Sequence, residues 1–255
     1  GDQCLLEQGL YLEELACYQN LIDPSAAQRT LSKACEINPA VIRPSLELAP
    51  RAKVMEAAVQ ADAVFEYLAS YPDKKCLQLH VQSIFNGIHW GESGNSDLAE
   101  ECVKRAGQLL GFDSTRPERE DVRPGGPDNL WRLSPNEFLV IELKTEISRD
   151  DTRIIKKEAA QLGHSVSWLL DCYGRDVIVT PIFVHPSSKS KDDCHPLSGT
   201  RVIDKACWDS LGKEVTSLVT ELVSSEYTVE ELAGVLMRRH LDRRHFVEHF
   251  TVQVV

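Results

Sequence analysis

The fold is decided by residues 124–144, PGGPDNLWRLSPNEFLVIELK. A Pro-Gly-Gly-Pro turn is followed by a short apolar stretch, a second turn at residues 134–136, and a longer apolar run that ends at Lys144. Clusters of Pro, Gly and Asn mark turns, and short apolar runs between them are typical of strands. We therefore expect two strands, residues 128–133 and 137–144, and the second has the composition of a buried central strand.

Two carboxylates and a lysine stand at the ends of these strands. Asp128 opens the first strand, and Glu142 and Lys144 close the second. Side chains on a strand alternate between faces, so Glu142 and Lys144 point the same way while Leu143 points into the core. If the two strands pair through the short turn, Asp128 lies beside Glu142. Two converging carboxylates suit Mg²⁺ or Mn²⁺, and a nearby lysine stabilises charge on a phosphate or on an attacking water. This pattern indicates metal-assisted phosphodiester hydrolysis.

The flanking sequence predicts the rest of an α/β domain. Over residues 97–184 the expected order is helix, three strands, helix and strand. The expected ranges are a helix at 97–110, strands at 112–118, 128–133 and 137–144, a helix at 150–172 and a strand at 177–184. A short strand at 201–204 and C-terminal helices at 205–224 and 228–241 follow.

Pro127-Asp128 followed by Glu142-x-Lys144, in this order of elements, resembles the PD-(D/E)xK nuclease superfamily with its restriction-endonuclease-like fold. The resemblance covers roughly residues 97–184, with residues 200–255 as an extension. It implies an αβββαβ core and a Mg²⁺- or Mn²⁺-dependent deoxyribonuclease. Residues 110–131 also look like nuclease modules attached to bacterial helicases and defence proteins. This second likeness implies an endonuclease module of a larger DNA-processing or antiviral defence protein, with a helicase or ATPase as a candidate partner.

The same resemblance implies site residues on the flanking helices. In the superfamily a Glu on the helix before the first strand often helps to hold the metal. Similarity to the corresponding helix of archaeal Holliday-junction resolvases favours Glu100, although helical projection leaves both Glu100 and Glu101 open. Gln161, with Lys157 one turn earlier, matches a polar position that contacts DNA. The implied metal ligands are therefore Glu100, Asp128 and Glu142, and the implied catalytic residues are Asp128, Glu142, Lys144 and Gln161.

The N-terminal part of the chain has a different pattern. Residues 1–95 predict an all-helical domain with a partner-binding or positioning role, and the Gly- and Ser-rich stretch 87–96 separates it from a nuclease-like domain at 96–255. No apolar run approaches the roughly 18–20 residues of a membrane helix, and no basic segment typical of a signal peptide precedes the first helix. The scattered cysteines include no C-x-x-C pair and indicate free thiols. Free thiols are typical of a reducing compartment, so we expect a cytoplasmic protein. Because the chain does not begin with Met, we also expect it to be a piece of a longer protein.

The charge of the chain opposes the nucleic-acid prediction. The 255 residues include 28 Lys and Arg against 39 Asp and Glu, a net charge of -11. Phosphate affinity depends on clustered cations, so we expect weak, salt-sensitive DNA binding, with another domain or partner delivering the substrate. A homodimer is a further expectation, since cutting both strands usually needs two sites. The alternative hypothesis is a catalytically silent nuclease fold that serves as an interaction scaffold.

Three further groups leave alternatives open. Four arginines near the motif fit either phosphate contacts or a solvated loop, namely Arg116, Arg119, Arg123 and Arg132. A zinc site is disfavoured because its candidate ligands lack the usual spacing, namely His185, Cys194, His195 and Cys207. A basic C-terminal patch fits either a nucleic-acid or partner surface or a solvated helix face, and it contains His240, His245 and His249.

Overall fold

The computed structural model describes residues 2–22, 24–38, 40–42, 51–71, 73–121, 124–224 and 227–255. The chain divides into two compact units, Gly1–Glu56 and Ala57–Val255. In the first unit, helices α1 (Asp2–Gln19) and α2 (Pro24–Ile37) pack against each other. The Asn38 side-chain amide donates to the carbonyl of Leu6 over 3.0 Å and joins the two helices.

A six-stranded open sheet forms the centre of the second unit, and its strands follow the chain in the order β1-β2-β3-β4-β5-β6. The pairs β3–β4 and β4–β5 are parallel and the other three are antiparallel, so the sheet is mixed. The strands are β1 (Asp113–Thr115), β2 (Asn129–Ser134), β3 (Glu137–Leu143), β4 (Ile178–Val184), β5 (Arg201–Ile203) and β6 (Val252–Gln253).

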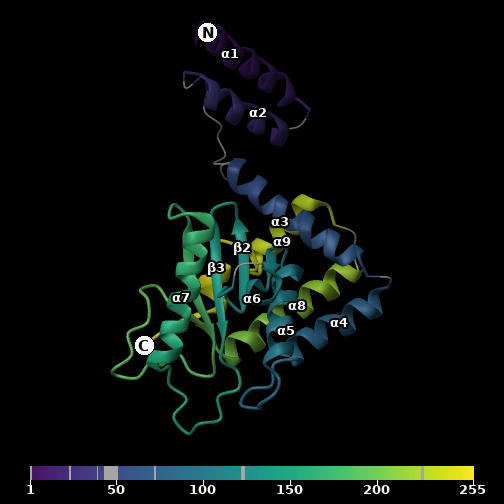
Figure 1. Cartoon of the computed structure of the whole chain (residues 1–255). Coiled ribbons are helices and arrows are strands. Elements are labelled where there is room, and N and C mark those ends of the chain that lie inside the picture. The colour runs from purple at the N-terminus through teal and green to yellow at the C-terminus, as the bar shows by residue number, and fades with distance from the viewer. Residues whose placement is uncertain are drawn as a thin grey trace. The chain divides into compact units, whose positions relative to one another are not determined.

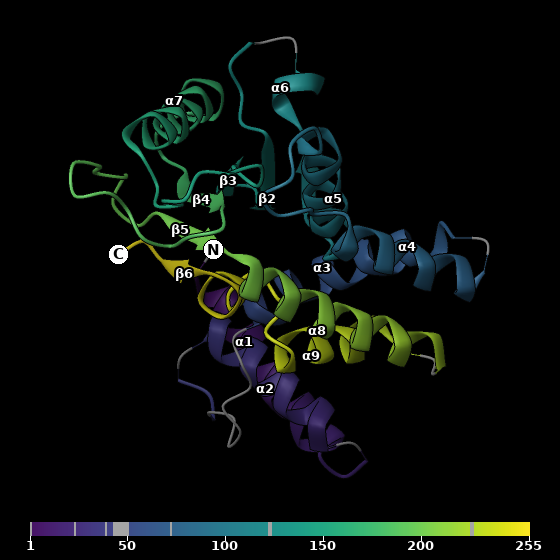
Figure 2. The same ribbon diagram turned by 90° about the horizontal axis from the view of Figure 1, so that it is seen from below.

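Helices cover both faces of this sheet. The helices after α2 are α3 (Arg51–Ala69), α4 (Lys74–Asn86), α5 (Ser96–Leu109), α6 (Pro117–Glu120), α7 (Lys156–Tyr173), α8 (Lys205–Ser224), α9 (Val229–Arg238) and α10 (Phe246–Phe250). Helix α7 packs on one face, whereas α5 and α8 lie on the other side of the sheet (Figures 1 and 2). Strand β3 contributes Phe138 and Val140 to the α7 side and Leu139 and Ile141 to the opposite side, and all four are fully buried. This two-sided burial confirms β3 as a central strand.

The mixed α/β class and the element order expected for residues 97–184 are confirmed, with two differences in detail. The strand expected at 112–118 is shorter, because the chain turns into the additional helix α6 at Pro117. The ring of this proline fixes φ near the helical value, which suits the first position of a helix. The helix expected from residue 150 begins at Lys156, because Ile154 first bridges to Ser190 and the Glu158 carboxylate then accepts the N–H of Ile155 over 2.9 Å.

Helices α3 and α4 share the core of the second unit. Val64 of α3 and Val81 and Ile84 of α4 are buried in the same cluster as the α5 side of the sheet. The Trp208 indole of α8 donates to the carbonyl of Phe85 over 3.1 Å. The boundary expected between residues 95 and 96 thus falls inside the compact unit that starts at Ala57. Across the part of the chain that is described, no helix is both long and apolar enough to cross a membrane.

Candidate functional site

The antiparallel pairing of β2 and β3 brings Asp128 and Glu142 together. Asn129 is paired with Ile141, so the register places Asp128, the preceding residue, opposite Glu142. The Asp128 Oδ2 atom accepts the N–H of Leu143 over 2.7 Å, which fixes the carboxylate against the end of β3. Asp128 is only 7% exposed. The juxtaposition expected from the turn between the two strands is therefore present in the structure.

Glu142 points toward α7 and is almost completely buried, with 1% of its surface exposed. Its Oε1 atom accepts a hydrogen bond from the Ser165 hydroxyl over 2.6 Å, and its Oε2 atom lies 3.3 Å from Lys144 Nζ. Burial and the neighbouring Asp128 carboxylate raise the pKa of Glu142 to about 7, against the opposing effects of Lys144 and Ser165. Nothing in the sequence pattern indicated Ser165, although its position four residues after Gln161 places both on one face of the helix.

The ammonium group of Lys144 lies among the oxygens of the site. Lys144 Nζ donates to the carbonyl of Leu143 over 2.9 Å and is 3.8 Å from Asp128 Oδ2, in addition to its contact with Glu142. As the strand alternation predicted, Glu142 and Lys144, the residue directly after β3, lie on the same side of the sheet, while Leu143 belongs to the core on the opposite side. The structure thus brings three of the expected catalytic side chains into one cluster.

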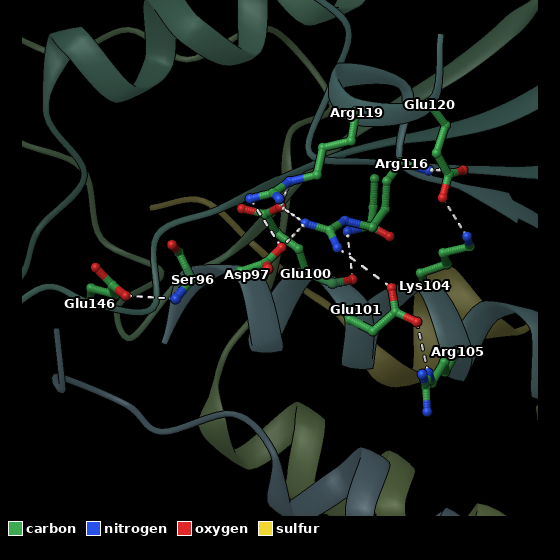
Figure 3. A network of polar contacts seen from close by, with 11 residues as sticks. Ser96, Asp97, Glu100, Glu101, Lys104, Arg105, Arg116, Arg119, Glu120 and Glu146 are labelled. Carbon is green, nitrogen blue, oxygen red and sulfur yellow. Dashed lines mark hydrogen bonds and ion pairs between the residues drawn. The ribbon is translucent and has the colours of Figure 1, made fainter. Parts of the chain in front are cut away.

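Glu100 is buried in a different set of contacts (Figure 3). It is paired through Oε2 with the Arg116 guanidinium and lies 3.8 Å from Arg119 Nε. Burial and the Asp128 charge raise the pKa of Glu100, while the two arginines lower it. Glu101 pairs with Arg105 at 2.8 Å and reaches Arg116 at 3.5 Å. Both candidate helix ligands are therefore engaged by arginine side chains.

The arginines near the motif make contacts within the chain. Arg116 is 6% exposed, and its NH2 group also donates to Asp97 over 2.6 Å. Arg119 pairs with Asp97 at 3.0 Å (Figure 3). Arg132 donates to the carbonyls of residues 134 and 135 and stacks over the Phe138 ring at 5.6 Å. Arg123 lies outside the described residues.

Glu118 of α6 is a further acidic residue near the site. Partial desolvation and the Asp128 carboxyl raise the pKa of Glu118, whereas Arg119 and Lys144 lower it. The sequence pattern did not indicate Glu118, because α6 itself was not expected.

Gln161 lies on an exposed part of α7 and makes no side-chain contact with the carboxylates among the interactions of the described residues. Ser165, one turn later, donates to the carbonyl of Gln161 over 3.2 Å and to Glu142. Gln161 is therefore adjacent to the cluster and open to solvent. Lys157 is also exposed.

The carboxylate oxygens of the cluster are suited to a hard divalent cation, although the side chains are not arranged around one. Within the described ranges, no group of three His, Cys, Asp or Glu side chains has the geometry of a metal site. Asp128 and Glu142 nevertheless present carboxylate oxygens, the preferred ligands of Mg²⁺ and Mn²⁺, on both sides of the Lys144 ammonium. The raised pKa of Glu142 comes first from burial and second from the neighbouring Asp128 charge, and a bound cation would offset the second of these causes.

Two of the candidate zinc ligands, His185 and Cys207, lie in environments that the structure describes. His185 is fully buried, with Nδ1 2.7 Å from the Ser187 carbonyl and Nε2 3.6 Å from Glu158 Oε2. Glu158 also binds Arg149 at 3.0 Å, and despite burial these contacts lower the pKa of Glu158 to about 2. Burial raises the pKa of the Cys207 thiol to about 11.

The basic C-terminal patch lies near the other end of β3 from Glu142. Arg243 pairs with Glu137, the first residue of that strand, at 3.1 Å. His240, His245 and His249 are exposed, and the rings of His240 and His249 stack with centroids 4.3 Å apart. This patch is therefore separate from the carboxylate cluster.

No family model, curated protein or solved structure matches the chain.

Proposed function

We propose that the second unit is a metal-dependent nuclease of the PD-(D/E)xK type that hydrolyses phosphodiester bonds in DNA. Asp128 and Glu142 hold Mg²⁺ or Mn²⁺ in this proposal, Lys144 acts on the attacking water or the scissile phosphate, and Gln161 contacts the strand. The module belongs to a larger cytoplasmic DNA-processing or defence protein, and a helicase or ATPase delivers the substrate.

The observation that supports this proposal is the convergence of Asp128, Glu142 and Lys144 at adjacent ends of β2 and β3. Two carboxylates that each lie within 4 Å of one ammonium group are costly to bury unless the charges compensate each other or bind a ligand. The order helix, three strands, helix, strand around them is the order expected of that superfamily.

Each side chain has a task that follows from its contacts. The Leu143 N–H holds Asp128, and Ser165 holds Glu142, so both carboxylates are oriented before a ligand arrives. The Lys144 ammonium is positioned to stabilise negative charge that develops on a phosphate. A bound divalent cation would supply Lewis acidity and a water of lowered pKa. Gln161, exposed one turn from Ser165, is free to hydrogen-bond a phosphate or base.

The test is incubation of the purified chain with linear, circular and branched DNA in Mg²⁺ or Mn²⁺. We expect Asp128→Ala and Lys144→Ala to lower the cleavage rate by about a hundredfold or more, the scale for removing a group that stabilises transition-state charge. The matched controls Asp113→Ala and Lys213→Ala alter exposed side chains on β1 and α8 and should cleave as the unaltered chain does. Cleavage that survives both site substitutions would contradict the proposal, and an RNA substrate in parallel identifies an RNase.

A catalytically silent nuclease fold is the second candidate. The contacts that favour it are the pairing of Glu100 with Arg116 and of Glu142 with Lys144, which neutralise the carboxylates within the protein. In the first unit, Tyr11, Leu21 and Ile22 are at least 70% exposed, as in a surface that binds a partner. A metal titration separates the two candidates, since a silent site would show no divalent-cation binding that depends on Glu142.

A further inference from the structure

A pocket of about 680 Å³ lies beside β5 and β6, the two strands at one edge of the sheet (Figure 2). Its lining comes mainly from the segment 194–201, from α10 and from residues 253–255. The volume falls within the range of roughly 300–1,000 Å³ that is usual for small-molecule sites. Asp128, Glu142 and Lys144 do not line it, so the pocket is separate from the carboxylate cluster.

The lining includes a buried cation, Arg201, which is the first residue of β5. The Arg201 side chain is only 10% exposed. Its Nε donates to the Thr251 hydroxyl over 2.7 Å, and its Nη2 donates to the carbonyls of Val247 over 3.1 Å and Thr251 over 3.0 Å. These three acceptors are neutral, so they hold the guanidinium in place without balancing its charge.

The carboxylate beside this guanidinium compensates it only weakly. Glu248 Oε2 lies 3.7 Å from Arg201 Nη2, and the Glu248 side chain is 79% exposed. Water screens an ion pair with so exposed a partner, so the pair contributes little. Arg201 Nη1 donates no hydrogen bond within the described residues and is not one of their sealed polar atoms. An acceptor that enters the pocket thus meets a buried cation with a donor still to offer.

The loop before β5 adds polar groups to the same lining. The Thr200 N–H donates to the carbonyl of Leu197 over 3.1 Å and closes a turn, in which Gly199 has a φ of +79°. Glycine adopts this conformation without steric cost. The turn places His195 and Ser198, both exposed, in the lining of the pocket. An imidazole nitrogen and a hydroxyl group can each donate to an oxyanion.

We propose that this pocket binds a small molecule through a carboxylate or phosphate group that contacts Arg201. The bound anion supplies the counter-charge that the neutral acceptors lack, and it competes with Glu248 for the guanidinium. Pro196, Leu197 and Val254 also line the pocket and suit an apolar part of the ligand. The site goes beyond the proposed nuclease function, because none of its residues takes part in that function.

The test is titration of the isotope-labelled full chain with phenyl phosphate, benzoate and benzyl alcohol, followed through the amide chemical shifts. The first two compounds carry an anionic group on an aromatic ring, and the third is uncharged. We expect the two anions to shift the amides of Gly199, Thr200 and Val254, and benzyl alcohol to bind about tenfold or more weakly. Tighter binding of phenyl phosphate identifies a phosphate ligand, and tighter binding of benzoate identifies a carboxylate.

Substitutions on the two sides of the ion pair should act in opposite directions. Arg201→Gln should weaken the binding of phenyl phosphate about tenfold or more, because it removes the charged donor. Glu248→Gln should tighten it about two- to fivefold, because it removes the competing carboxylate. Glu230→Gln is the matched control, since Glu230 is an exposed residue of α9 outside the lining, and its affinity should equal that of the unaltered chain.

Three results would each overturn the proposal. They are equal affinity for benzyl alcohol and the two anions, amide shifts that leave the pocket residues unchanged, and an affinity for phenyl phosphate that Glu248→Gln does not raise. If Arg201→Gln does not fold, Glu248→Gln alone decides, because its exposed side chain can be altered without disturbing the core.

Discussion

At the scale of single residues, the environment of Glu142 disfavours its ionised form. Its carboxyl group is almost fully buried beside a second carboxylate, with Ser165 and Lys144 as its compensating partners. Desolvation and like charge both disfavour its ionised form, and its pKa is accordingly raised to about 7. Groups poised near neutral pH in this way are common at functional sites.

The raised pKa predicts how stability depends on pH in the presence of a metal chelator. An unfolded Glu releases its proton near pH 4.5, whereas folded Glu142 retains it to about pH 7. Between these values the folded state binds more protons, so the free energy of unfolding should fall as pH rises, by up to about 3 kcal/mol. Denaturant titrations at pH 4, 5, 6, 7 and 8 measure this slope, because these pH values bracket the interval between the two pKa values.

Glu142→Gln removes the titrating group, so the unfolding free energy of this variant should change less with pH. Glu230→Gln alters an exposed side chain of α9, and its unfolding free energy should depend on pH as that of the unaltered chain does. Comparing the pH dependence of the two variants cancels the contributions of other groups. One of these is Glu158, whose lowered pKa means that its contribution to stability is lost only in acid. Identical slopes for Glu142→Gln and the unaltered chain would contradict the assigned pKa.

At the scale of elements, the packing of α5 on β2 positions the acidic helix. Gly107 lies on the buried side of α5, where an added Cβ would meet the Trp131 ring at 2.6 Å and Ser114 Cβ at 2.8 Å. The close approach lets the Asn129 side-chain amide donate to the Glu100 carbonyl over 3.0 Å. A small residue at one point of the helix therefore sets the distance between the helix and the strand that follows Asp128.

Gly107→Ala should consequently destabilise the chain by roughly 1–3 kcal/mol, because overpacking against Trp131 outweighs the gain in helix propensity. The matched substitution is Gly163→Ala in α7, where an added Cβ meets nothing within 4 Å. It should stabilise the chain by about 0.5–1 kcal/mol. Chemical denaturation of both variants is the measurement, and a stabilising Gly107→Ala would show that the helix and strand can separate at little cost.

At the scale of the whole molecule, the second unit includes more of the helical region than its pattern suggested. Helix α4 and the C-terminal part of α3 bury apolar side chains in the core on the α5 side of the sheet. Gln60 of α3 also donates to the carbonyls of Leu110 over 2.8 Å and Leu241 over 3.0 Å. These contacts connect segments 50 and 181 residues apart.

A chain of residues 51–255 should therefore fold and unfold cooperatively, whereas residues 96–255 should not. Removing α3 and α4 exposes the apolar surface around Ile84 and Val81 and leaves the Leu110 and Leu241 carbonyls without the Gln60 amide. Thermal unfolding followed by circular dichroism, with size-exclusion chromatography for aggregation, distinguishes the two chains. A cooperative transition in residues 96–255 would place the boundary where the Gly- and Ser-rich stretch suggested.

The sequence by itself determined the features that depend on local pattern. The apolar run at residues 137–144 predicted a buried strand, and the alternation of side chains along a strand predicted that Glu142 and Lys144 share one face. The turn at 134–136 predicted the pairing that brings Asp128 to Glu142. The spacing of Thr228 and Glu231 fits the capping box that starts α9. Strand periodicity, turn residues and helix caps act over a few positions, so they can be read from neighbouring residues.

Only the tertiary structure decided which side chains compensate the buried charges. The Ser165 hydroxyl reaches Glu142 across 23 positions of the chain, and Arg116 reaches Glu100 across 16. Neither contact has a local signature, because each arises when helices α5, α6 and α7 pack onto the ends of β2 and β3. The strand that carries a carboxylate determines where the carboxylate lies. Its partner, its pKa and its availability to a cation depend on the distant segments that pack around it and exclude water.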